Sequence, residues 1–171
     1  MKGVWMVVAA LVLGGCASLQ YGTPQATAEL KDAGGKAVGR VRLWESADGV
    51  RILARVRELP PGQHGIHLHA IGKCDPPDFS TAGGHFNPAG RQHGLKNPGG
   101  PHAGDLPNLD IAADGRGGLD HVTRLVTLAP GPTSLFGPQG TAVVIHANPD
   151  DAVTDPSGSS GGRIACGVLN R

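Results

Sequence analysis

The chain has 171 residues, with 15 basic and 14 acidic side chains and a formal net charge of +1 at pH 7; 28 residues are Gly and 14 are Pro, together about a quarter of the sequence. The glycines follow no three-residue period, which excludes a collagen-like repeat, and 39% apolar with 17% charged residues argues against a disordered chain. Because Gly and Pro interrupt helices, we expect one loop-rich, all-β domain.

The first fifteen residues are predicted to be an export signal. Lys2 precedes an apolar run over residues 4–13, which is too short to span a bilayer. The run ends in Leu13-Gly14-Gly15-Cys16, which resembles a bacterial lipobox and predicts cleavage before Cys16 and a lipid on its sulfur. The alternative is a plain signal peptide with an incidental cysteine. A lipid at Cys16 predicts an exported, membrane-anchored lipoprotein facing the periplasm or the cell exterior, with residues 16–25 as its tether.

Residues 26–171 are predicted to form the folded domain. Apolar and polar residues alternate over 26–31, 40–43 and 51–57, the pattern of strands with one buried and one wet face. Asp114-Gly115 is a plausible hairpin turn between two of the later strands. These later strand candidates are Leu109–Ala112, Leu119–Leu128, Thr141–His146 and Arg163–Leu169. The sequence therefore favours an eight-stranded sandwich or barrel.

Two long segments, residues 70–107 and 147–162, show no strand periodicity. Loops of such length are uncommon in compact domains unless a function or an internal cross-link orders them. The three cysteines of the chain are an odd number for an exported protein. If Cys16 carries a lipid, Cys74 and Cys166 remain, and in an oxidising compartment they are expected to form a disulfide.

The histidines indicate a metal site. His67 and His69 are two residues apart, so on a strand both point to one face, although such a pair alone is more often two ordinary surface histidines. Further candidate ligands are His85, His93, His102, Asp105 and His146. Six imidazoles and one carboxylate without a free thiol argue against blue copper, iron–sulfur and thiolate zinc, and suit Cu(II) and Zn(II). Seven ligands fill two four-coordinate sites only if one imidazole is shared.

Four motifs in this order resemble copper/zinc superoxide dismutase, and the resemblance covers about residues 26–170. The motifs are Gly65-Ile66-His67-Leu68-His69, Gly83-Gly84-His85-Phe86-Asn87-Pro88, Gly104-Asp105-Leu106 and Gly161-Gly162-Arg163-Ile164-Ala165-Cys166-Gly167-Val168. The resemblance implies an eight-stranded Greek-key β-barrel with an immunoglobulin-like sandwich architecture.

The resemblance also assigns roles to individual residues. It implies that the two metal sites share His85. The implied copper ligands are His67, His69, His85 and His146, and the implied zinc ligands are His85, His93, His102 and Asp105. It further implies a Cys74–Cys166 disulfide, an active-site Arg163, and an Asp150 that orients one ligand of each metal. The alternative for Asp150 is an ordinary loop aspartate.

The implied reaction is the disproportionation of superoxide to dioxygen and hydrogen peroxide by Cu(II)/Cu(I) cycling, with structural zinc. His85 would carry a proton, and Arg163 would attract and orient the anionic substrate. The alternatives are a non-catalytic copper/zinc-binding or storage lipoprotein on the same scaffold, and an adhesion or structural lipoprotein, for which no feature speaks. The expected partners are superoxide, a membrane through Cys16 and possibly a second copy of the chain. The near-zero charge without a basic run gives no case for nucleic acid.

Overall fold

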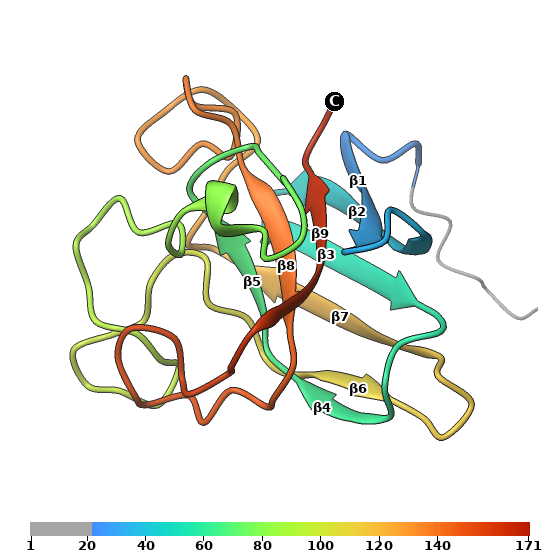
Figure 1. Cartoon of the computed structure of the whole chain (residues 1–171). Helices are drawn as coiled ribbons and strands as arrows, with labels where there is room; N and C mark the ends of the chain where they lie inside the picture. Colours follow the sequence, from blue (N-terminus) through green and yellow to red (C-terminus); the bar gives the residue numbers. More distant parts are fainter. Residues whose placement is uncertain (1–21) are drawn as a thin grey trace, which may run out of the picture.

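The computed structural model describes residues 22–171, which form an antiparallel β-barrel with long loops at one side (Figure 1). The predictions for the signal segment 1–15, for Cys16 and for residues 17–21 of the tether lie outside the described residues. Within residues 22–171, no helix is long and apolar enough to cross a membrane.

The described residues contain nine strands and one short 3-10 helix, η1 (Ser80–Ala82). The strands are β1 (Ala26–Asp32), β2 (Ala37–Ser46), β3 (Gly49–Val56), β4 (Gly62–His64), β5 (Ile66–His69), β6 (Leu109–Ile111), β7 (Gly117–Thr123), β8 (Ala142–His146) and β9 (Arg163–Val168). The predicted all-β Greek-key fold is confirmed.

All strands belong to one sheet with the order β4-β6-β7-β3-β2-β1-β9-β8-β5, and every pair is antiparallel. The two edge strands, β4 and β5, are separated in the chain by Gly65 alone. Because consecutive residues are 3.8 Å apart, this connection brings the two edges of the sheet together and nearly closes the barrel.

The barrel core follows the predicted alternation. In β1, β2 and β3 the inward residues are buried, among them Leu30, Val41, Leu43 and Ile52 at 0% exposure. The outward residues of the same strands are partly or fully exposed. One apolar core thus holds the strands in register, because a one-residue slip would turn the apolar side chains outward.

Two details differ from the sequence prediction. The strand β4 was not expected, and it raises the number of strands from eight to nine. The predicted strand 119–128 ends at Thr123, although Val126 and Leu128 remain buried. The strand ends there because Thr123 pairs with Val50, next to the first residue of β3, so β3 offers no further partner. Beyond this end, the Glu45 carboxylate accepts hydrogen bonds from the backbone N–H groups of Leu128 and Ala129 at 3.2 and 3.1 Å. The Glu45 side chain thereby accepts hydrogen bonds from backbone N–H groups that have no neighbouring strand to pair with.

The two long segments are loops, as predicted, and the first is fastened to β5 by its backbone. Leu68 donates its backbone N–H to Gly104 O at 2.9 Å and accepts the N–H of Phe86 at 2.8 Å. The close approach requires glycine at position 104, because a Cβ there would lie 2.3 Å from Leu68 O. Residues 85–105 are therefore held against the strand that carries His67 and His69.

Candidate metal centre

The first group of imidazoles, which we call the copper group, gathers where β5, β8 and the first long loop meet. β5 supplies His67 and His69, β8 ends with His146, and the loop brings His85 into a backbone bridge opposite His69. Each of these four residues has a ligand atom within 4.8 Å of those of the others. Strand alternation explains why His67 and His69 share one face.

The inward nitrogens of the copper group are buried and have no hydrogen-bond partner among the described residues. These atoms are His67 Nδ1, His69 Nε2, His85 Nε2 and His146 Nε2. Buried polar atoms of proteins are almost always paired. Four nitrogens that face one another without a partner among the described residues are therefore suited to bind a metal cation. Four imidazole nitrogens fit copper.

The outer nitrogen of each of three rings is fixed by an oxygen. His67 Nε2 lies 2.7 Å from Asp150 Oδ2, His69 Nδ1 lies 2.9 Å from Gly83 O, and His146 Nδ1 lies 3.1 Å from Gly161 O. Each oxygen accepts the ring N–H and leaves the opposite nitrogen with its lone pair directed into the group. The protein thereby sets the tautomer that a metal requires.

The second group, which we call the zinc group, is built around one carboxylate. Asp105 Oδ1 lies 2.9 Å from His85 Nδ1, 3.0 Å from His93 Nδ1 and 3.3 Å from His102 Nδ1. The other oxygen, Oδ2, accepts the backbone N–H groups of Gly94 and His102 at 2.8 and 2.9 Å. Three imidazoles and one carboxylate are a ligand set that suits tetrahedral zinc.

His85 belongs to both groups. Its Nδ1 faces Asp105, while its Nε2 is one of the unpaired nitrogens of the copper group. A single imidazole has two nitrogens on opposite sides of its ring, so it can bind one metal through each when it has lost both protons. The geometry provides the shared ligand that two four-coordinate sites need.

Asp150 lies between the two groups from the other side. Its Oδ2 contacts His67 of the copper group, and its Oδ1 lies 3.0 Å from His93 Nε2 of the zinc group. Asp150 is itself held by Asn108, whose side chain accepts the Asp150 N–H at 2.8 Å and donates to the Asp150 carbonyl at 2.9 Å. One buried carboxylate thus contacts a ligand of each group.

Burial and charge act differently on the two groups. Burial lowers the pKa of His67 to about 3 and that of His146 to about 4, so both rings are neutral at pH 7 and free to bind metal. Burial also opposes protonation of His93, but the hydrogen bonds that its ring donates to the Asp105 and Asp150 carboxylates outweigh it and raise the pKa of His93 to about 9. The two carboxylates thus favour a positive charge at the zinc group.

Arg163 lies at the mouth of the centre and is held by the disulfide loop. A cavity of about 410 Å³ is lined by Arg163 together with His69, His85 and His146. Arg163 donates to the carbonyl oxygens of Phe79 and Gly83 at 2.5 and 2.6 Å. Both carbonyls belong to the loop that the disulfide fastens to β9.

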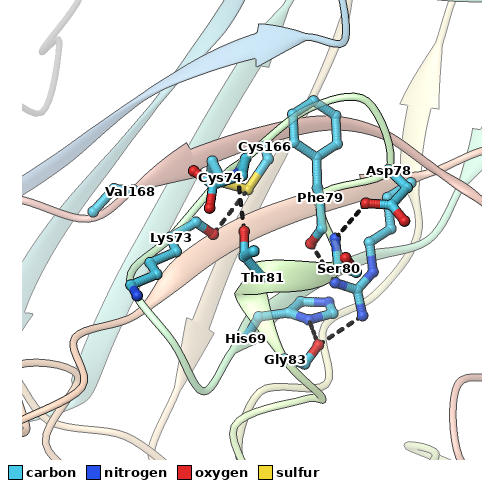
Figure 2. Close-up of a disulfide and its surroundings, with 12 residues drawn as sticks. His69, Lys73, Cys74, Asp78, Phe79, Ser80, Thr81, Gly83, Cys166 and Val168 are labelled. Atoms are coloured by element: carbon cyan, nitrogen blue, oxygen red, sulfur yellow. Dashed lines mark hydrogen bonds between the residues drawn. A yellow bond between two sulfur atoms is a disulfide. The ribbon is translucent and has the colours of Figure 1, made fainter.

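The structure contains the predicted disulfide between Cys74 and Cys166. Figure 2 shows it beside the segment that carries Phe79, with Gly83 next to His69. Because Gly83 O accepts hydrogen bonds from both His69 and Arg163, one carbonyl positions a ring of the copper group and the guanidinium together. The covalent link therefore supports the site and not only the barrel.

Asp155 is a residue near the centre that the sequence did not single out. Its Oδ1 accepts the backbone N–H of His93 at 2.6 Å and lies 3.8 Å from His102 Nε2. The sequence showed it only as one acidic residue in a loop. The contact joins residues 62 positions apart, so no local pattern could have indicated it.

The fold and the centre together define a class: a β-barrel protein with two adjacent metal sites that share one histidine. Residues 37–169 match the copper/zinc superoxide dismutase family. The chain belongs to this family, whose two metals agree with the two ligand groups.

Relatives in sequence carry the same family name. The chain is 46% identical to superoxide dismutase [Cu-Zn] 1 of Aquifex aeolicus over 144 residues, which are 83% of this chain and 85% of the relative. It is 43% identical to superoxide dismutase [Cu-Zn] of Caulobacter vibrioides over 147 residues, 84% of each chain.

Solved structures agree with the fold. A superoxide dismutase-like protein from Bacillus subtilis superposes with a TM-score of 0.81 at 41% identity, over 84% of this chain and 97% of the other. The Cu/Zn superoxide dismutase from Brucella abortus gives a TM-score of 0.70 at 29% identity, over 85% of this chain and 100% of the other.

Proposed function

We propose that this chain is a copper/zinc superoxide dismutase that converts two superoxide anions and two protons into dioxygen and hydrogen peroxide. The observation that carries the proposal is the set of four buried, unpaired imidazole nitrogens that face one another beside Arg163. Membership of the family and the complete set of predicted ligands support it.

The metals, His85 and Asp150 have different roles in the proposed reaction. Bound copper supplies the one-electron cycle between Cu(II) and Cu(I), and bound zinc supplies charge without redox change. His85 moves the proton: its Nδ1 stays fixed beside Asp105 while its Nε2 accepts a proton in the first half-reaction and releases it in the second. Asp150 keeps the rings of His67 and His93 in place during the cycle.

Arg163 orients the substrate. Its guanidinium is half-buried, points into the cavity of the copper group, and is positioned by two backbone carbonyls. A fixed cation at the mouth of a small cavity attracts an anion and holds it in one orientation. The acidic residues of the loop 147–162 work against attraction over long distances, so the effect of Arg163 is local.

The experiment is to load the protein with copper and zinc and measure the decay of superoxide. We expect rapid decay, and a large loss in Arg163→Gln with unchanged metal content. Ser157 lines the same cavity, and Ser157→Ala serves as the control substitution. A fully metallated protein that leaves the decay rate unchanged would refute the enzyme and favour metal storage.

We further propose that the protein is exported and anchored by a lipid on Cys16. The residues Leu13 to Cys16 support the anchor, and a disulfide between Cys74 and Cys166 suits an oxidising compartment. The mass of the N-terminal peptide tests the lipid: we expect a diacylated Cys16, whereas an unmodified Cys16 would contradict the anchor. The homodimer that the sequence allows stays a prediction, which sedimentation of the loaded protein tests.

A further inference from the structure

Five of the chain's ten arginines line one groove on the outer surface of the barrel. The groove, which we call the arginine groove, has a volume of about 410 Å³ and runs over β2, β3 and the turn between β6 and β7. Its arginines are Arg40, Arg42, Arg55, Arg57 and Arg116, and its one carboxylate is Glu29. The metal centre lies elsewhere, at β5, β8 and the long loops, which Figure 1 shows apart from β2 and β3.

At the centre of the arginine groove two like charges face each other without a close ion pair among the described residues. Arg40 on β2 lies directly opposite Arg55 on β3. Like charges in this position destabilise a sheet. Among residues 22–171, neither Arg40 nor Arg55 forms an ion pair, and Glu29 beside Arg40 contacts Lys31 instead at 3.5 Å. The opposition of Arg40 and Arg55 costs the barrel stability, and an anion bound between them would relieve it.

The backbone makes room for one of these arginines. Gly118 on β7 is paired with Arg55 in the sheet, and a Cβ at position 118 would come within 2.6 Å of Arg55 Nη1. The absence of a side chain at Gly118 therefore lets the guanidinium of Arg55 lie across the sheet.

The arginines at the rim are only weakly engaged. Arg57 lies 3.7 Å from Glu58, and Arg116 lies 4.0 Å from Asp114. Exposed ion pairs of this kind contribute little to stability. Both guanidinium groups are thus available to a ligand.

The spacing of the arginines suits a surface of many anions. Neighbouring strands are about 4.8 Å apart and alternate residues on a strand about 7 Å apart, so the five guanidinium groups spread over several phosphate-sized positions. Each planar guanidinium can hold a phosphate through two parallel hydrogen bonds. A single small anion would leave most of the array unused.

The N-terminal end of the described chain reaches the same face. Trp44 donates its indole N–H to Gly22 O at 2.7 Å, and Trp44, Arg42 and Arg40 are alternate residues of β2. Gly22 is six residues beyond Cys16, a distance of at most about 21 Å. A lipid on Cys16 would therefore keep this face close to a bilayer.

We propose that the arginine groove docks the domain onto an anionic membrane surface, with its guanidinium groups on the phosphodiester headgroups. The argument from proximity rests on the proposed anchor at Cys16, whereas the argument from charge does not. Docking would turn the opposite side of the barrel, with the metal centre, away from the lipid.

The test uses the full chain with Cys16→Ser, loaded with copper and zinc, so that binding does not depend on lipidation. Its partition is measured between buffer and vesicles of phosphatidylcholine, and between buffer and vesicles of equal parts phosphatidylcholine and phosphatidylglycerol. The apolar residues 4–13 contribute to both, so the ratio of the two partition coefficients reports the charge. The double variant Arg40→Gln/Arg55→Gln is compared with a control double variant, Lys73→Gln/Lys96→Gln. The control removes the same charge outside the arginine groove.

We expect the parent to prefer the anionic vesicles by at least about tenfold, with a preference that falls as salt rises. The arginine pair should lose most of that preference, about tenfold, and the lysine pair less than about twofold. Equal partition of the parent, or equal losses in the two pairs, would overturn the proposal. Binding to soluble polyphosphate without binding to anionic vesicles would assign the groove to a soluble polyanion instead. The mass of Cys16 and the superoxide assay report separately on the anchor and on the enzyme.

Discussion

The β1–β3 side of the barrel and the two long loops are stabilised by different forces. Strands β1 to β3 bury apolar side chains such as Leu43 and Ile52 and pair their backbones along their whole length. The loops bury polar groups instead, among them His93 and Asp105 at 0% and 1% exposure. The apolar core is complete without a ligand, whereas the loops are held by polar contacts that converge on the two metal groups, in which His85 Nε2 has no partner among the described residues. The barrel is therefore the scaffold, and the loops are the part whose order depends on their ligands.

The largest effect is expected from the removal of one copper ligand. His146→Ala deletes one of the four converging nitrogens, and superoxide decay should slow by on the order of a thousandfold with loss of copper. The barrel should stay folded, because the backbone pairs of β8 remain. His121→Ala, on β7 outside both groups, serves as the matched control and should keep full activity. Retained activity in His146→Ala would show that the copper group is assigned wrongly.

Removal of both metals should separate the two regions. We expect amide hydrogen exchange to accelerate by about a hundredfold or more in residues 85–105 and 147–162, because the zinc ligands and Asp150 lie in these loops and zinc binds only the state in which they are ordered. Exchange in β2 and β3 should hardly change. Equal acceleration in the strands and loops would mean that the barrel also depends on metal and would contradict the division.

Features that follow from a local pattern can be predicted from the sequence, whereas features that depend on strand register cannot. Alternation along a strand is a local pattern, so strands such as β3 and the pair His67 and His69 could be predicted. The arginine groove could not, because the opposition of Arg40 and Arg55 appears only once the register of β2 and β3 is known. The net charge of the chain is near zero, so the total charge gives no sign of a local cluster of arginines.

The contacts that the loops make could not be predicted from the sequence either. The roles of Asp150 and Arg163 were inferred only from a resemblance, since nothing in their own neighbourhood indicates a partner. The contact of Glu45 with residues 127–129 spans more than 80 residues and holds the chain that follows β7. Such contacts depend on how the loops fold over the barrel, which no periodicity encodes.

The disulfide should matter to both regions. In Cys74→Ser with Cys166→Ser, the free energy of unfolding in urea should fall by about 2–5 kcal/mol. Activity should fall too, because the loop that offers Phe79 O and Gly83 O to Arg163 is no longer fastened to β9. Thr133→Ala, at an exposed position in the loop between β7 and β8, is a control outside this segment. Unchanged stability and activity in the double variant would show that the disulfide neither stabilises the fold nor positions Arg163.

A smaller effect is expected at Asp155. Asp155→Asn weakens the acceptor for the His93 N–H and removes the charge beside His102, so zinc affinity should fall by about tenfold. Competition with a zinc chelator measures it. Asp151→Asn, which alters the charge of the same loop without contact with a zinc ligand, should change the affinity far less. Equal effects of the two substitutions would mean that only the net charge of the loop matters.

The smallest effect is expected on the barrel, at the pair formed by Arg51 and Asp120. Arg51 donates Nε and Nη2 to the two oxygens of Asp120 at 2.7 and 2.5 Å, and this bonding lowers the pKa of Asp120 below its usual value near 3.8. A lowered pKa in the folded state gives stability that is present above the unfolded value and is lost as the pH falls through the folded one. Because the pair is exposed, Asp120→Asn should cost less than about 1 kcal/mol at pH 7.

The same difference should vanish in strong acid, where Asp120 is protonated in both states. Urea unfolding of the parent and of Asp120→Asn as a function of pH measures it, and Asp48→Asn, whose carboxylate is 87% exposed, is the control. The metal content should be identical in all three proteins, because no ligand loop is touched. A loss of zinc in Asp120→Asn would mean that the scaffold and the loops are energetically coupled, and the separation between the two regions would fail.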